Sequence, residues 1–158
     1  MASDAKLAEV KAAFPVSMFR KGDRRRVRQL WEMLAAMPRS VPVREELERL
    51  RLMAVYEHVP AARLAVAQGL IAQAARLRVQ LDDLAEDIAA HGLTELFQQS
   101  EKQEPYTRER PASAIFVKFD KNYQTLMGKL DAMIPPPPES EEKKADKLSA
   151  FLDGGADG

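Results

Sequence analysis

Cysteine is absent from this 158-residue chain, and that absence excludes disulfides, thiolate zinc sites and a cysteine nucleophile. Long apolar runs are missing as well, since no stretch approaches the roughly 20 residues that a membrane-spanning helix needs. The first residues are not followed by the apolar segment of a secretory signal. We therefore expect a cytoplasmic protein without a membrane partner.

An excess of charge of either sign is also lacking, because 24 Lys and Arg residues balance 24 Asp and Glu residues. A protein that coats DNA by bulk attraction is usually basic overall. Any contact with nucleic acid must then come from a local basic patch, or from many copies of the chain acting together.

Catalytic motifs are missing from the sequence. It contains no GxxxxGK[ST] phosphate loop, no GxGxxG and no GxSxG. The two histidines, His58 and His91, lack a metal-ligand partner at a suitable spacing. Each lies near the C-terminus of a predicted helix, where capping of the helix end is the simpler role. We expect no enzymatic activity, no metal and no cofactor.

A group of acidic residues on one predicted helix could be mistaken for a two-metal site. It lacks acidic partners that converge from elsewhere, which such sites require. A solvated face, or a face that forms salt bridges with Arg76 and Arg78 of another subunit, explains it better. The group comprises Asp82, Asp83, Glu86 and Asp87.

What the sequence does contain is helix-forming residues, chiefly Ala, Leu, Arg, Glu and Gln, with little glycine before the tail. No convincing strand alternation is present, so the predicted fold class is all-α. Only a few residues around Pro60 separate two helices, which favours an antiparallel helical hairpin with a long central helix and a C-terminal docking helix. The predicted helices span residues 3–13, 24–37, 43–57, 61–91 and 111–133.

The long helix over 61–91 carries two apolar surfaces. One stripe, which includes Leu70, Leu77 and Leu84, can pack within the hairpin. The second surface is rich in small residues and is predicted to contact a neighbouring subunit, although both faces could instead be buried within one chain. This predicted oligomerisation surface comprises Leu64, Ala65, Ala72, Ala75 and Val79.

The strongest local concentration of charge precedes and opens the second helix. Clustered guanidinium groups offer forked donors to phosphate oxygens, and a glycine turn lets them fan along a backbone. The alternative is that several of these side chains pair with Glu residues elsewhere or snorkel over the core. We call this set the basic patch, and its predicted DNA-binding residues are Arg20, Lys21, Arg24, Arg25, Arg26 and Arg28. Lys118, Lys121 and Lys129 add a weaker basic face on the last helix.

The remaining segments separate three regions. Residues 1–39 hold the N-terminal helices and the basic patch, and residues 40–134 form the helical oligomerisation core, in which 93–98 extends or kinks a helix and 99–110 is an exposed loop. Residues 135–158 begin with a four-proline stop and continue as a charged, disordered tail. Leu148, Phe151 and Leu152 on that tail are predicted to dock into a partner; a frayed end is the alternative.

Residues 40–134 resemble the phage terminase small subunits of the P27-like type. The resemblance rests on the helical hairpin, the His91-Gly92-Leu93 step, the polar stretch after it, and a proline-led last helix. The residues that carry the last motif are Pro111, Lys118, Lys121, Tyr123, Leu126, Leu130, Ile134 and Pro135.

This resemblance implies a homo-oligomeric ring with a central channel that binds double-stranded viral DNA in the host cytoplasm and recruits or regulates the large terminase subunit. The large subunit would hold the ATPase and nuclease. Residues 1–39 lie outside the resemblance, so the DNA-binding role of the basic patch is inferred from its own chemistry. Two alternatives stay open: a dimeric helical DNA-binding regulator, and a helical scaffold that does not bind DNA.

Overall fold

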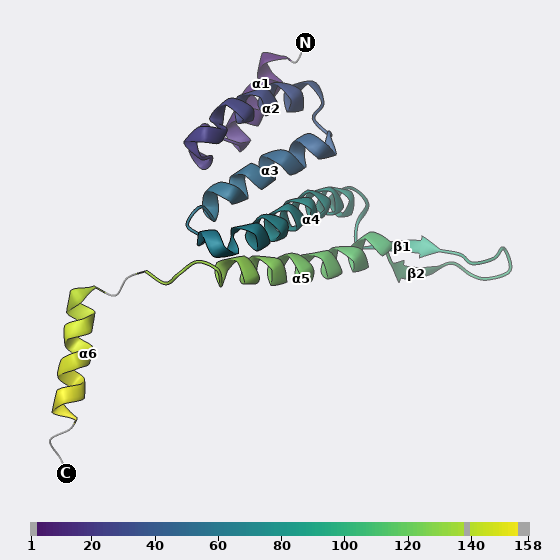
Figure 1. The fold of residues 1–158 in the computed structure, drawn as a ribbon. Coiled ribbons are helices and arrows are strands. Elements are labelled where there is room, and N and C mark those ends of the chain that lie inside the picture. The colour runs from purple at the N-terminus through teal and green to yellow at the C-terminus, as the bar shows by residue number, and fades with distance from the viewer. Residues whose placement is uncertain (1–2, 138–139, 155–158) are drawn as a thin grey trace.

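The computed structural model describes residues 3–137 and 140–154, and it is mostly helical with one small β-hairpin. Helices α1 to α5 stack as successive layers, while the hairpin and α6 extend beyond opposite ends of α5, the last layer (Figure 1). The helices are α1 (Asp4–Ala13), α2 (Arg24–Ala36), α3 (Val41–Val55), α4 (Leu64–His91), α5 (Pro111–Asp131) and α6 (Glu141–Asp153). The strands are β1 (Thr94–Phe97) and β2 (Tyr106–Glu109), and short 3-10 turns cover Val16–Met18, Lys21–Asp23 and Ala61–Arg63.

The helix ends follow local chemistry that the sequence displays. The Ser3 hydroxyl accepts a hydrogen bond from the Lys6 amide and caps α1. Pro42 lies in the first turn of α3, where no intrahelical N–H is needed. Gly92 ends α4 with a φ of 83°, a left-handed conformation that glycine adopts without a Cβ clash. The predicted helices over the first 133 residues are thereby confirmed with small shifts at their ends.

Two hydrophobic cores flank α3. The N-terminal core joins α1, α2 and the first half of α3, and the C-terminal core joins the second half of α3 to α4 and α5. The N-terminal core comprises Phe19, Val27, Leu30, Trp31, Leu34, Val43, Leu47 and Leu50. The C-terminal core comprises Leu52, Met53, Tyr56, Val59, Ala67, Ile71, Ala74, Ala75 and Leu130. Helix α3 therefore forms the wall that both cores share.

Two polar contacts fix the ends of this stack. The Trp31 indole Nε1 donates to the Phe14 carbonyl at 3.0 Å and holds the end of α1 against α2. The Tyr56 hydroxyl donates to Asp131 at 2.6 Å and joins the end of α3 to the end of α5. Burial, and then this hydrogen bond, raise the pKa of Tyr56 well above its ordinary value.

The β-hairpin corrects the prediction of an all-α fold. β1 and β2 pair antiparallel, with Phe97 opposite Tyr106, in the segment that was expected to be a kink and a loop. The Arg108 guanidinium lies 3.4 Å from the centre of the Phe97 ring and also bonds Glu95 at 2.8 Å. Two four-residue strands give too little alternation to detect, and these cross-strand contacts between side chains outweigh the weak local propensity.

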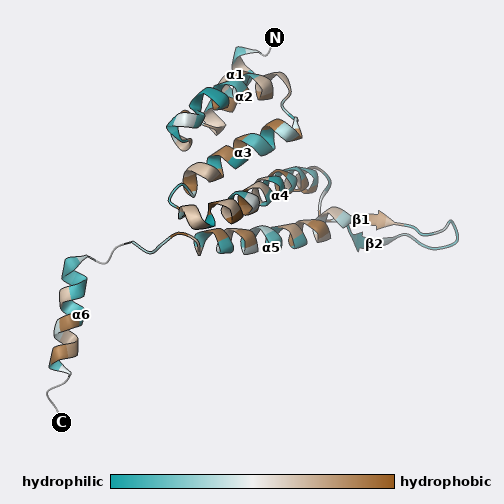
Figure 2. Ribbon diagram, viewed as in Figure 1, coloured by the Kyte–Doolittle hydropathy of each residue, from teal (hydrophilic) through white to brown (hydrophobic). Residues whose placement is uncertain are grey.

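Helix α6 corrects the prediction of a disordered tail over 141–153. Ser140 caps it, and Glu141 and Glu142 stand in its first turn, where negative charge suits the helix dipole. Each of its residues is exposed, and its second half is the apolar one (Figure 2). Parts of the predicted tail, 138–139 and 155–158, lie outside the described residues.

Candidate nucleic-acid interface

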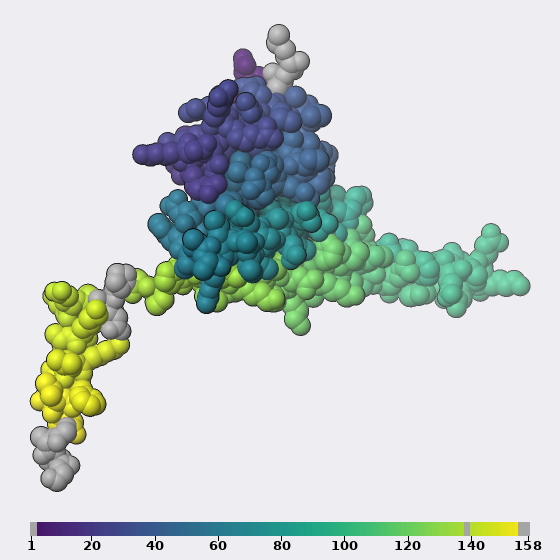
Figure 3. All heavy atoms as spheres, in the orientation of Figure 1, coloured from purple at the N-terminus to yellow at the C-terminus, as the bar shows by residue number. Residues whose placement is uncertain are grey.

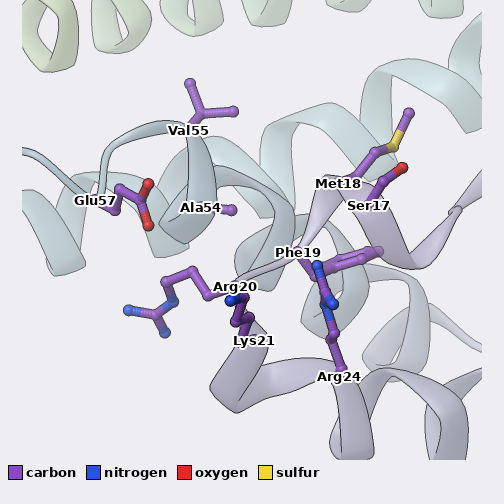
Figure 4. A pocket seen from close by; sticks show the side chains of 9 residues that line it. All are labelled: Ser17, Met18, Phe19, Arg20, Lys21, Arg24, Ala54, Val55 and Glu57. Atoms are coloured by element: carbon purple, nitrogen blue, oxygen red, sulfur yellow. The ribbon is translucent and has the colours of Figure 1, made fainter.

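The basic patch surrounds a surface hollow where the chain enters α2. Phe19 is buried in the N-terminal core and anchors the turn that carries Arg20 and Lys21. That turn, the start of α2 and the end of α3 enclose about 580 Å³. Figure 4 shows Arg20, Lys21 and Arg24 around this hollow, with Val55 and Glu57 of the α3 end on its far side. The hollow lies on the N-terminal half of the molecule, which forms a compact block in Figure 3.

Most of the basic patch has no acidic partner. Arg20 is the exception, since its Nε donates to Asp23 at 2.7 Å. Arg26 makes only a long contact, 3.5 Å, to the Gln29 side chain. Within residues 3–137 and 140–154, the structure gives no ion pair to the other patch residues, which are Lys21, Arg24, Arg25 and Arg28.

The six side chains do not form one uniform surface. Arg25 and Arg28 are exposed and lie near Arg24 around the α2 axis, because residues one, three and four apart fall within about a third of a helical turn. Arg24 is half-buried, and its Nε is shielded from solvent without a hydrogen-bond partner among the described atoms. Arg26 is turned toward α3, where its charge helps Arg49 to lower the pKa of Glu46. The groups best placed for phosphate are Lys21, Arg25 and Arg28.

Several arginines elsewhere in the molecule, unlike most of the basic patch, form ion pairs with carboxylates. Each carboxylate of the acidic group on α4 has its own arginine: Arg78 pairs with Asp82, Arg44 with Asp83, Arg39 with Glu86 and Arg110 with Asp87. These arginines belong to the same chain, so the expectation of a salt-bridging face toward another subunit's Arg76 and Arg78 is wrong for Asp82. Arg39 and Arg44 join α4 to the start of α3, and Arg110 joins it to the start of α5, whereas Arg78 pairs within α4.

The end of α4 shows how this pairing works. The hydrogen bond from Arg110 holds the pKa of Asp87 below its ordinary value, and the same guanidinium donates to the Gly92 carbonyl at 2.9 Å. The His91 ring Nδ1 lies 3.1 Å from the Asp87 carbonyl oxygen, as expected of a side chain that caps a helix C-terminus. His58, by contrast, is exposed beside Glu57 at 3.6 Å.

The predicted oligomerisation surface is divided by the fold. Ala75 and Val79 are 1% and 3% exposed, so they belong to the interior of a single protomer and are wrongly assigned to a subunit contact. Ala72 is half-buried, while Leu64 and Ala65 are exposed. Helix α3 covers more of α4 than the stripe pattern indicated, because a stripe in the sequence does not say which of two faces a neighbour will cover.

A group of exposed apolar residues, which the sequence reasoning missed, lies on the hairpin and α5. Its members are exposed although they are large and apolar; Leu96 is 76% and Val117 64% exposed. Leu93 and Leu96 were the available signal, because two leucines are unexpected in a segment predicted to be a kink before an exposed loop. We call this group the apolar strip, and it comprises Leu93, Leu96, Tyr106, Ile115 and Val117. It covers more than one face, because Leu96 and Tyr106 lie on opposite faces of the hairpin and Ile115 and Val117, two residues apart, lie on opposite sides of α5.

The predicted partner-binding residues share one face of α6, because Leu148, Phe151 and Leu152 are three and four residues apart. All are exposed, with Phe151 at 81%. The structure thus brings these three together, away from the basic patch and the apolar strip (Figure 1).

No set of three or more metal-ligating side chains gathers anywhere in the described ranges. None of the helices there is long and apolar enough to cross a bilayer. Comparison of the chain with protein-family models, curated proteins and solved structures found no match.

Proposed function

We propose that this protein is a DNA-packaging adaptor of the terminase small-subunit kind. In this role it binds double-stranded viral DNA through the basic patch, self-associates, and recruits or regulates a separate large subunit that supplies ATPase and nuclease activity. The resemblance of residues 40–134 to such subunits supports the packaging role, and the basic patch supports the contact with DNA.

The observation that carries the proposal is the contrast between arginines. Eight arginines pair with carboxylates, namely Arg20, Arg39, Arg44, Arg49, Arg51, Arg78, Arg108 and Arg110. Arg25 and Arg28 on α2 keep exposed guanidinium groups that have no such partner among the described residues. An unpaired, solvated guanidinium can meet a phosphate without first giving up an internal ion pair, which makes this patch the better anion site.

Self-association would make a small patch effective. Each chain offers only a few phosphate contacts, and the net charge of the whole protein is zero. When several copies bind one duplex, the later contacts are intramolecular and the overall affinity rises steeply. The apolar strip offers candidate contacts for a second copy, because large apolar side chains gathered on an exposed segment often mark a protein–protein contact.

The test is the salt dependence of duplex DNA binding. Replacing Arg25 and Arg28 with glutamine should weaken binding and reduce the slope of log K against log salt by about 0.9 for each phosphate that the variant no longer neutralises. The matched control is K143Q/K144Q on α6, which removes the same charge at exposed positions and should leave the slope unchanged. Fluorescence anisotropy with a labelled duplex measures both.

The outcomes separate the candidate functions. Weak, sequence-independent binding that R25Q/R28Q reduces supports the packaging adaptor. Tight preference for one short sequence would favour a dimeric regulator. Absence of binding by the unmodified protein would contradict the proposal and favour a scaffold that does not contact DNA.

A further inference from the structure

A basic groove runs between α4 and α5. It is separate from the basic patch, which lies on other elements and in another part of the sequence. It encloses about 430 Å³. Its walls come from both helices and contain no acidic residue: Gln73, Arg76, Leu77, Gln80, Asn122, Thr125, Leu126 and Lys129. We infer that this groove is a second binding site for the phosphate backbone of duplex DNA.

The composition of the groove matches that ligand. Guanidinium, ammonium, amide and hydroxyl groups are the side-chain donors that contact phosphate and sugar oxygens. Arg76 on α4 and Lys129 on α5 supply the positive charge from opposite walls. Gln73, Gln80 and Asn122 supply neutral donors between them, and Leu77 with Leu126 forms the apolar lining.

The cations of the groove are available to a ligand. Arg76 and Lys129 are exposed, and neither forms an ion pair within the described ranges. Arg76 also borders a smaller hollow that contains Glu45 and Glu46. Arg49 already holds Glu46 there through two hydrogen bonds of 2.8 Å, which leaves the Arg76 guanidinium uncommitted to that carboxylate.

Helical geometry extends the groove along α5. Residues 118, 121, 122, 125 and 129 recur at intervals of three and four and so share one face. Lys118 and Lys121 are both exposed on that face. The helix rises about 16 Å from Lys118 to Lys129, at 1.5 Å per residue. At 3.4 Å per step this corresponds to about five base pairs of one DNA strand.

The polar face is distinct from the face that α5 uses for packing. Tyr123, Met127 and Leu130 pack into the C-terminal core, on the opposite side of the helix from Lys118 and Thr125. Asp120 and Asp131, the acidic residues of α5, also lie on the packing side; Asp120 accepts from Gln124 at 2.7 Å and Asp131 accepts from Tyr56. Negative charge on α5 is therefore kept away from the groove.

The experiment compares two double variants of the full-length protein on the same labelled duplex of mixed sequence, between about 50 and 200 mM salt. R76Q/K129Q removes the groove cations, and R25Q/R28Q removes those of the basic patch. The variant K143Q/K144Q is the matched control. We expect R76Q/K129Q to weaken binding and to lower the salt slope by about 1.8, the value for two phosphates that are no longer neutralised. Circular dichroism checks that each variant keeps the helical content of the unmodified protein.

The outcomes of this experiment distinguish the groove from the basic patch. If the salt slope is unchanged in R76Q/K129Q but lower in R25Q/R28Q, DNA binding by the groove is overturned and the proposed function still stands. If the salt slope falls in R76Q/K129Q alone, the result supports DNA binding by the groove and contradicts DNA binding by the basic patch. A competition experiment on the R25Q/R28Q protein tests the identity of the ligand. If polyglutamate displaces the labelled DNA as efficiently as unlabelled duplex does at equal charge concentration, the assignment to DNA is overturned in favour of an acidic peptide.

Discussion

Helices α2 and α5 have similar sequence patterns but very different surroundings. Both carry a broad apolar stripe, yet α2 buries Val27, Leu30, Trp31, Leu34 and Ala35 in 13 residues, whereas α5 buries only Ser113 and Leu130 in 21. Helix α2 is enclosed by α1 and α3, while α5 packs along α4 on one side of the stack. Helix α2 thus buries most of its apolar stripe and α5 leaves most of its own partly uncovered, although Met37, Val55 and Val66 in the N-terminal half are exposed as well.

This difference indicates where the proposed self-association would take place. The sequence pattern placed it on α4, where α3 and α5 in fact supply much of the cover. The uncovered residues lie instead on α5 and on a hairpin of only two strands, an arrangement that is marginally stable in water by itself. A second copy that packs on one face of the apolar strip would stabilise the hairpin and bury the side chains of that face.

The largest effect is expected from charges placed in the apolar strip. The variant I115E/V117E should shift the protein to a lower mass, because the two positions lie on opposite sides of α5 and a carboxylate buried in a subunit contact on either side is costly. It should leave the helical content unchanged, since Ile115 and Val117 are exposed in the protomer. Light scattering measures the mass. The variant L64E/A65E is the matched comparison; if it alone dissociates the protein, the contact lies on α4 as the sequence pattern suggested.

A smaller effect is expected when substitutions in the two halves are compared by the unfolding free energy that they cost. Leu47 is fully buried in the N-terminal core, and L47A should cost about 2–5 kcal/mol of unfolding free energy. Leu126 on α5 is half-buried, so L126A should cost only about 1 kcal/mol in the protomer. Urea denaturation at low protein concentration provides both values. Equal costs would show that Leu126 on α5 is as well covered as Leu47 on α3, which would contradict the difference in burial between the two halves.

The contact between the α3 and α5 ends should have a modest, pH-dependent effect. Removing the Tyr56 hydroxyl in Y56F should cost about 1 kcal/mol, the usual worth of a hydrogen bond. The folded-state pKa of Tyr56 is raised above its ordinary value of 10.0, so its contribution is fully present below pH 10.0 and declines as pH rises toward the folded value. The unmodified protein should therefore lose more stability above pH 10.0 than Y56F does. Parallel pH profiles would contradict this assignment.

Substitutions in α6 are expected to have no effect on stability. Replacing Leu148, Phe151 and Leu152 with alanine removes apolar groups that are exposed in the protomer, so the unfolding free energy and the oligomer mass should not change. Retention of the large subunit in a pull-down should fall, while the control K143Q/K144Q keeps it. A drop in oligomer mass would assign these residues to self-association instead.

The sequence was informative where local chemistry decides structure. Proline and glycine marked the ends of α3 and α4, and the spacing of Val27, Leu30 and Leu34 gave the buried face of α2 correctly. The three helices that pack around the C-terminal core were predicted to within a few residues. The basic patch was correctly located in the turn before α2, although its role in binding stays a prediction.

What sequence patterns could not give was decided by contacts between distant segments. Arg108 and Phe97 stack only after the hairpin closes, so neither four-residue strand carries a signal by itself. The burial of Val79 depends on where α3 crosses α4. The groove between α4 and α5 combines Arg76 with Lys129, two residues whose proximity no spacing within one helix can reveal.

The most direct test of self-association and DNA binding together is the native mass of the unmodified protein at micromolar concentration, with and without duplex DNA. We expect a single homo-oligomer of the 17.7 kDa chain that takes up the duplex as a unit. A monomer that remains monomeric with DNA present would contradict the proposed function.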